Sequence, residues 1–119
     1  MATISSHALN SVTGVHASDL RVELYRIESS GMRVLLLETR TDEGGRLTEE
    51  LTLLPSQLDL IYELVFDSAG YFSALNSNFN DRVVQEVVVR LQMKDPQATY
   101  HIPIMLAPNS FSAWWSAAE

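Results

Sequence analysis

The sequence predicts an all-β fold, either a sandwich or a small barrel, and two observations carry that prediction. Apolar and polar residues alternate with a period of two over most of the chain, as they do in strands that bury one face. Turn-forming residues interrupt the alternation at regular intervals, which leaves room for about six to eight short strands. The interrupting segments are residues 29–31, 42–45, 76–81, 94–96 and 107–109.

The alternation assigns the strands one by one. Residues 20–25, 60–67 and 83–93 each place apolar side chains on one parity and polar side chains on the other. Residues 32–40 are apolar on both parities in the middle, as expected for a strand that is covered on both faces. Residues 100–106 form a further strand with an apolar side. The N-terminal stretch alternates only weakly.

One short α-helix is expected at residues 68–75, SAGYFSAL, because this segment follows a strand and Ser68 can act as its N-cap. A second helix over residues 55–64 is an alternative, but residues 62–66 fit a strand better. The sequence shows no repeat, linker or low-complexity segment. Residues 1–119 are therefore expected to form a single domain.

Composition excludes several classes of function. The chain has 119 residues, of which 46% are hydrophobic, so it can bury one core. Its net charge of −7 repels phosphate backbones and anionic lipid, which disfavours nucleic-acid and membrane-surface roles. It has no cysteine, hence no disulfide or thiolate site. Without a signal peptide or an apolar run of about 20 residues, it is expected to be soluble and cytoplasmic.

The three histidines, His7, His16 and His101, are the side chains that titrate nearest to neutral pH. His101 has the opposite parity from its two apolar neighbours, so it points away from the face that they bury. Periodicity alone equally fits a half-exposed histidine without a role. His7, taken alone, fits an ordinary surface residue, and His16 lies in an expected loop with no further signal.

Arg46 is a candidate for recognition of a carbonyl or carboxylate group, because it stands where the Gly44-Gly45 turn enters a strand. It could equally pair with Glu43 or Glu49 at the strand edge. The acidic residues around this turn lack the spacing of a calcium loop. The sequence has no glycine-rich phosphate loop and no G-x-S-x-G elbow.

Six segments, in their order along the chain, resemble the transthyretin-related family, whose enzymatic branch is 5-hydroxyisourate hydrolase. They are ISSHALN at residues 4–10, Gly14, LRVELYRI at 20–27, TDEGGR at 41–46, YELVFDSAGYF at 62–72 and YHIPIMLAPNSFS at 100–112. The resemblance implies a transthyretin-like β-sandwich of two four-stranded antiparallel sheets with one short α-helix. It also implies a homotetramer, a dimer of dimers, whose active sites line the channel between the dimers.

The same resemblance implies a set of site residues. The family's enzymes use a histidine of the N-terminal strand, an arginine after the glycine-bearing turn and the histidine of a Y-H-[IV]-P segment. The matching residues are His7, Arg46 and His101. The family's C-terminal Tyr-Arg-Gly-Ser signature falls on Trp114-Trp115-Ser116-Ala117, so its tyrosine hydroxyl, arginine charge and terminal serine hydroxyl are absent. The resemblance places Trp114, Trp115 and Ser116 at the substrate.

In the family reaction, water attacks a ring carbonyl and opens an amide-like C–N bond of a purine-derived ring. A neutral imidazole can accept the proton of water, and an arginine can balance charge on the carbonyl oxygen. Loss of one buried charged contact costs about 1.5–3 kcal/mol, or roughly ten- to a hundredfold in rate or affinity. Two indoles in place of the signature would make the site more apolar and could stack on an aromatic ring.

Three interpretations remain open at this point. The chain is an ordinary 5-hydroxyisourate hydrolase of purine metabolism, a related hydrolase repurposed for another ring in specialised metabolism, or a non-catalytic protein that binds a hydrophobic ligand. We favour a hydrolase of this type, with a small cyclic substrate and a changed specificity. Neither a cofactor nor a metal is expected, because arginine is not a usable metal ligand. The tryptophan pair could instead seal a dimer edge.

Overall fold

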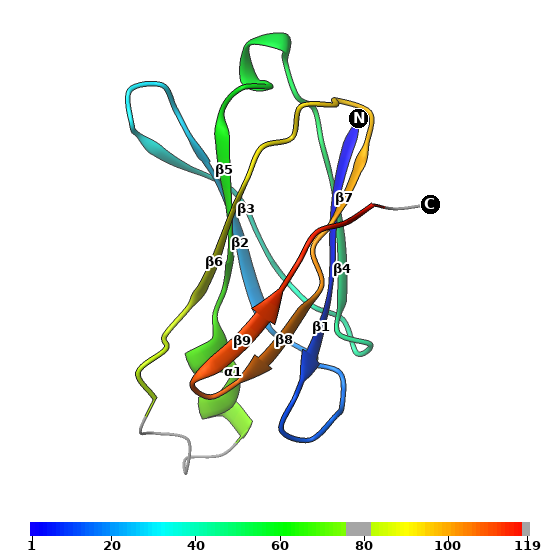
Figure 1. The fold of residues 1–119 in the computed structure, drawn as a ribbon, viewed down its shortest axis with the longest axis vertical. Helices are drawn as coiled ribbons and strands as arrows, with labels where there is room; N and C mark the ends of the chain where they lie inside the picture. The colour runs from blue at the N-terminus through cyan, green and yellow to red at the C-terminus, as the bar shows by residue number, and fades with distance from the viewer. Residues whose placement is uncertain (76–81, 118–119) are drawn as a thin grey trace.

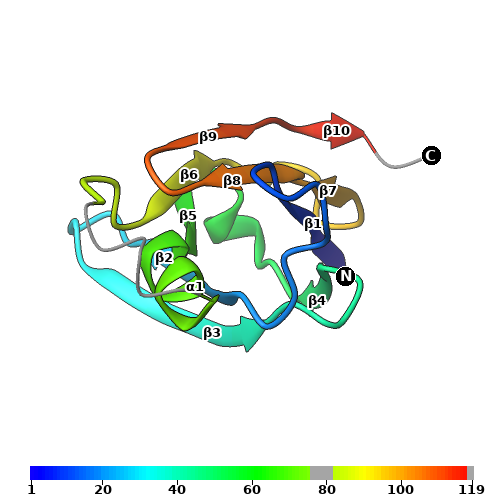
Figure 2. The same ribbon diagram turned by 90° about the horizontal axis from the view of Figure 1, so that it is seen from below.

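The chain folds into two β-sheets that face each other across a core, as the ribbon in Figures 1 and 2 shows. The structure is a computed structural model, and it describes residues 1–75 and 82–117. One sheet has the strand order β3-β2-β5-β6. Its strands are β2 (Arg21–Ile27), β3 (Arg33–Arg40), β5 (Ile61–Phe66) and β6 (Val87–Leu91).

The other sheet, hereafter the site sheet, has six strand segments that follow four strand paths. They are β1 (Ala2–Asn10), β4 (Arg46–Leu51), β7 (Thr99–His101), β8 (Ile104–Ala107), β9 (Ser110–Ala113) and β10 (Ser116–Ala117). β7 and β8 both run parallel to β1, while β10 and β9 continue the sheet antiparallel to them. The transthyretin-like sandwich with one α-helix is therefore confirmed. The expected continuous strand over residues 100–106 is wrong, because it is interrupted at Pro103, which has no backbone N–H to donate.

β1 is the central strand of the site sheet, with partners on both sides. Its residues are buried at every second position, although their hydropathy alternates only weakly. The inward Ser6 and Asn10 are polar but paired: the Ser6 hydroxyl donates to the carbonyl of Ile102 at 2.6 Å, and the Asn10 side chain accepts from the backbone N–H of Val12 at 2.9 Å. Buried polar groups that are paired in this way hide the period of two from a hydropathy pattern.

Two of the strand expectations differ from the structure. Residues 32–40 are not covered on both faces, since no residue of β3 is fully buried and Leu35 remains 48% exposed. The long strand expected over residues 83–93 is confined to β6, and Val83 is exposed. The turn expected at residues 76–81 lies outside the described residues.

The α-helix α1 (Ser68–Leu75) lies at one end of the sandwich, where Tyr71 and Phe72 are buried (Figure 1). Its N-cap is Asp67 and not Ser68, since the Asp67 carboxylate accepts the backbone N–H of Gly70 at 3.0 Å. The alternative helix at 55–64 is reduced to a single 3₁₀ turn, Pro55–Gln57, before β5. No helix within residues 1–75 and 82–117 is long and apolar enough to cross a membrane.

A charged network covers the outer face of the four-stranded sheet. Glu63 on β5 is only 6% exposed, and its carboxylate accepts hydrogen bonds from Arg33 at 2.9 Å and from Arg90 at 2.8 Å. The hydrogen bond from Arg33 lowers the pKa of Glu63 most strongly, while burial acts in the opposite direction. Arg33 also stacks 3.4 Å above the ring of Tyr25. The network connects β3, β2, β5 and β6, and so ties this sheet together.

We expect Glu63→Gln to reduce the free energy of unfolding at pH 7 by about 1–3 kcal/mol, because two guanidinium groups lose a charged acceptor. Since the pKa of Glu63 is lowered in the folded state, this contribution is present above the reference value of 4.5 and is lost as pH falls through the lowered pKa. Urea unfolding at pH 7 and at about pH 3 measures both effects. Glu38→Gln, which removes an exposed partner of Arg21, is the control and should change stability by about 0.5 kcal/mol or less.

Candidate functional site

The register of the site sheet brings three of the predicted site residues to one face. Arg46 on β4 pairs with His7 on β1, and His101 on β7 pairs with Ser5 on β1. Ser5 and His7 are two residues apart on an extended strand, so both point to the outer face of the sheet, away from the core. Strand spacing then puts the Cα atoms of His7 and His101 about 8 Å apart. Figure 1 shows β4, β1 and β7 side by side.

A tight turn delivers Arg46 to this position. Gly45 has φ +73°, and its carbonyl accepts the backbone N–H of Ala8 at 2.8 Å, which fixes the turn against β1. The Asp42 carboxylate accepts the N–H groups of Gly44 and Arg46, each at 2.9 Å. The guanidinium of Arg46 is exposed and has no ion pair within the described part of the chain. The alternative pairing with Glu43 or Glu49 is therefore wrong.

His101 is half-buried and is held by its neighbours on two sides. Its Nδ1 shares a hydrogen bond of 2.8 Å with the hydroxyl of Ser5. Ser116 on β10 lies directly opposite His101 in the antiparallel pair. Because Nδ1 is occupied by Ser5, the nitrogen of His101 that is left for another molecule is Nε2.

His7 has a partner that the sequence did not indicate, His16. Nε2 of His7 lies 2.9 Å from Nδ1 of His16, and the two ring centroids are 5.0 Å apart. The pKa of His7 is lowered, first by its partial burial and then by the positive charges of Arg46 and His16. A hydrogen bond to the backbone of Gly44 acts in the opposite direction. His7 is thus the neutral base over a wider pH range than a free imidazole.

Trp114 and Trp115 lie between β9 and β10, where the chain stays in register with the neighbouring segment. Ala113 pairs with Ile104 and Ser116 pairs with His101, so the register is unbroken between them. Trp114, whose N–H donates to the carbonyl of Pro103 at 3.3 Å, therefore shares the outer face with Ser116 and His101. Trp115 shares the inner face with Ala113. The indoles are 46% and 61% exposed, respectively.

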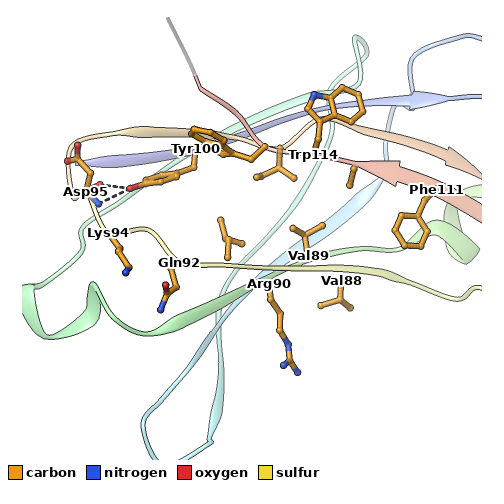
Figure 3. A pocket seen from close by; sticks show the side chains of 13 residues that line it. Val88, Val89, Arg90, Gln92, Lys94, Asp95, Tyr100, Phe111 and Trp114 are labelled. Atoms are coloured by element: carbon orange, nitrogen blue, oxygen red, sulfur yellow. Dashed lines mark hydrogen bonds between the residues drawn. The ribbon is translucent and has the colours of Figure 1, made fainter.

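The inner side of this edge borders a cavity of about 740 Å³, between β6 and the β9–β10 edge of the site sheet. Figure 3 shows Val88 and Val89 on one side and Tyr100 and Phe111 on the other, with the Trp114 indole turned away from β6. Both Trp114 and Trp115 line the cavity. The cavity is mainly apolar and opens where both sheets end, so it is distinct from the face that carries His7 and Arg46.

Sequence reasoning missed Ser5 and dismissed His16. Ser5 lies two residues before His7, so the sequence could have placed both side chains on the same face of the strand. The contact of Ser5 with His101, however, depends on a parallel register between segments 96 residues apart. His16 gave no signal at all, because only the return of its loop onto β1 brings it to His7. Within residues 1–75 and 82–117, no group of three or more His, Asp or Glu side chains could hold a metal ion.

Comparison with known proteins identifies similar chains along nearly the whole length. The model of the HIUase/Transthyretin family matches residues 4–115. A protein of Halalkalibacterium halodurans named 5-hydroxyisourate hydrolase is 30% identical over 114 residues, which cover 93% of this chain and 94% of that protein. 5-hydroxyisourate hydrolase 2 of Rhizobium meliloti is 30% identical over 112 residues, covering 93% and 92%. These matches confirm the resemblance read from the sequence motifs.

Solved structures show the same fold. The structure of Klebsiella pneumoniae 5-hydroxyisourate hydrolase superimposes with a TM-score of 0.75 at 24% identity and covers 97% of this chain and 99% of its own. A structure of (S)-allantoin synthase gives a TM-score of 0.77 at 23% identity, covering 98% of this chain but 44% of its own. At these identities the likeness concerns the fold.

We expect Gly45→Ala to destabilise the protein by about 2 kcal/mol or more, because the new Cβ would collide with the carbonyl oxygen of Ala8 at a positive φ. Gly44→Ala is the matched control in the same turn, where the new Cβ would meet the Asp42 carboxylate at an ordinary 3.5 Å. Thermal unfolding of the two variants measures the difference. Equal melting temperatures would contradict the close approach of this turn to β1.

Proposed function

The chain belongs to the HIUase/transthyretin family, and from this we propose that it is a hydrolase that opens the ring of 5-hydroxyisourate or of a closely related cyclic amide. The observation that carries the proposal is the presence of His7, Arg46 and His101 on one outer face of the site sheet. Two imidazoles and an unpaired guanidinium can supply a general base and a donor to the carbonyl oxygen, which serve the hydrolysis of a ring amide.

In the proposed reaction, Nε2 of His101 accepts a proton from water, whose oxygen forms a bond to the ring carbonyl carbon. Arg46 donates hydrogen bonds to the carbonyl oxygen as negative charge develops there. The C–N bond then breaks, and the imidazolium returns the proton to the departing ring nitrogen. Ser5, through Nδ1, holds the His101 ring in orientation throughout. His7 lies beside Arg46 as the second imidazole of the site.

We also propose that the substrate is more aromatic or more apolar than the usual one. The positions of the family's C-terminal signature carry indoles here, and the register supports a place for Trp114 on the face of His101 and Ser116. An indole offers a flat apolar surface on which a planar ring can stack. The apolar surface of the indole would replace part of the binding free energy that the arginine of the family's signature would supply.

The proposed assembly is a homotetramer, a dimer of dimers. Two features support it. β6 and the β9–β10 edge leave both sheets unpaired on the same side, next to the apolar cavity lined by Trp115 and Phe111 (Figures 1 and 3). Unpaired edges with exposed apolar side chains are covered in stable proteins. The outer face with His7 and Trp114 is then available for the second contact, which would enclose the site.

The activity itself is tested by generating 5-hydroxyisourate from urate and following its ultraviolet decay with and without the protein. We expect acceleration by the wild-type protein, and a loss of about 10²–10³-fold in His101→Ala and in Arg46→Ala. Glu38→Gln, on the other sheet, should keep wild-type activity. No acceleration, together with tryptophan quenching by apolar aromatic ligands, would favour instead a non-catalytic binding protein of the same fold.

The tryptophan pair gives a second test, because the proposal assigns its two members to opposite faces of the site sheet. Trp114→Ala should raise KM about 2–10-fold with little change in kcat, as expected for loss of one aromatic stacking contact. Trp115→Ala should instead shift the oligomer toward smaller species in analytical ultracentrifugation. If Trp115→Ala raises KM and Trp114→Ala dissociates the oligomer, the assignment of the two faces is reversed.

A further inference from the structure

The contact between His7 and His16 is a polar feature of the site that the proposed reaction does not use. Nε2 of His7 and Nδ1 of His16 are 2.9 Å apart, and the rings are tilted by 35°. A nitrogen–nitrogen distance of this size is a hydrogen bond, so one nitrogen carries the proton and the other accepts it. Each ring therefore fixes the tautomer of the other.

The loop that carries His16 is built on β1 itself. The backbone N–H of Asn10 donates to the carbonyl of Val15 at 2.8 Å, and that of Ala17 donates to the carbonyl of Ala8 at 2.9 Å. These bonds form a short antiparallel return in which His16 pairs with Leu9. The buried side chain of Asn10 accepts the N–H of Val12 and so holds the turn. His16 is exposed to solvent, yet its backbone is fixed from both sides.

The charges around the pair come from three other elements. Arg46 on β4 and His101 on β7 both lower the pKa of His7, as His16 does. Asp42 and Glu43 lie in the turn before β4, and the Asp42 carboxylate is engaged by two backbone N–H groups. The immediate electrostatic surroundings of His7 are therefore positive. A second proton on the pair is disfavoured there.

The hydrogen bond between the two rings also limits how many protons the pair can hold. With both rings neutral, one N–H lies between Nε2 and Nδ1. After one proton is added, one ring is an imidazolium and still donates to the other. After a second proton is added, both facing nitrogens carry hydrogen and neither can accept, so the hydrogen bond is lost. The intact pair thus holds one added proton and no more.

We propose that His16 is a positioning residue for His7, which fixes its ring through Nε2 and shares with it the single proton that the site accepts. The proposal rests on the proposed hydrolase function for its kinetic consequences, and on the geometry of β1 and its return loop for the pairing itself. A water molecule beside the substrate then contacts the ring of His7 in a fixed orientation. A proton added to that ring is shared with the ring of His16.

The test compares two variants of one position. His16→Asn retains a short side-chain amide that can hydrogen-bond near the place of Nδ1, whereas His16→Phe retains a ring without nitrogen. We expect His16→Phe to lower kcat about tenfold with little change in KM, and His16→Asn to keep at least about half of the wild-type kcat. Val15→Ala, the exposed neighbour in the same loop, is the control and should behave as the wild type.

The pH profile separates orientation from charge. Both His16 variants lack the ring that lowers the pKa of His7, so the part of the acidic limb of kcat/KM that reports His7 should move to higher pH in both. A merely structural role would lower activity without that shift. Equal kcat in the wild type and both variants, or equal loss in His16→Asn and His16→Phe, would overturn the proposal.

Nitrogen-15 NMR of the imidazole rings tests the pairing of His7 with His16 without measuring turnover. In the wild type, the shifts should show one proton shared between Nε2 of His7 and Nδ1 of His16, and in His16→Phe the titration of His7 should move to higher pH. An unchanged His7 titration would overturn the pairing. If the wild type does not hydrolyse 5-hydroxyisourate but these NMR signatures are present, the proposed function fails while the pairing stands.

Discussion

β1 is hydrogen-bonded to β4 along one edge and to β7 and β8 along the other, while its even-numbered side chains enter the core. This double pairing holds Ser5 and His7 on the outer face of the site sheet with fixed partners. A shift of one residue in β1 would turn both side chains into the core and bring Ser6 out. The arrangement of the candidate site therefore depends on the register of one strand, which burial of Ile4 and Ala8 enforces.

The outer face of the site sheet concentrates positive and titratable groups in a chain of net charge −7. Arg46 has no carboxylate partner among the described residues, and His7, His16 and His101 lie around it. The other sheet behaves differently, since its arginines are paired with Glu63 and with other carboxylates. An unpaired guanidinium keeps its donors free for a carbonyl or carboxylate group, while paired arginines stabilise the sheet that carries them.

The tryptophan pair shows that adjacent residues of an extended segment can face opposite sides of a sheet. The register gives Trp114 the parity of His101 and Trp115 that of Ala113, although both indoles border the apolar cavity beside β6. The proposed function assigns the two ideas weighed from the sequence, stacking on a substrate and sealing an edge, to different members of the pair.

The sequence by itself determined the all-β class, the short helix at residues 68–75 and the family motifs, because strand periodicity and turn residues are local properties. It also singled out the histidines by their titration and Arg46 by its place after a turn, but only the resemblance joined His7, Arg46 and His101 into one site. Only the tertiary structure decided that Ser5 meets His101 and that His16 meets His7. Both contacts need a strand register and a loop return that join distant segments, and no local pattern encodes such a pairing. For the same reason, paired polar residues inside β1 concealed from hydropathy the strand on which the site is built.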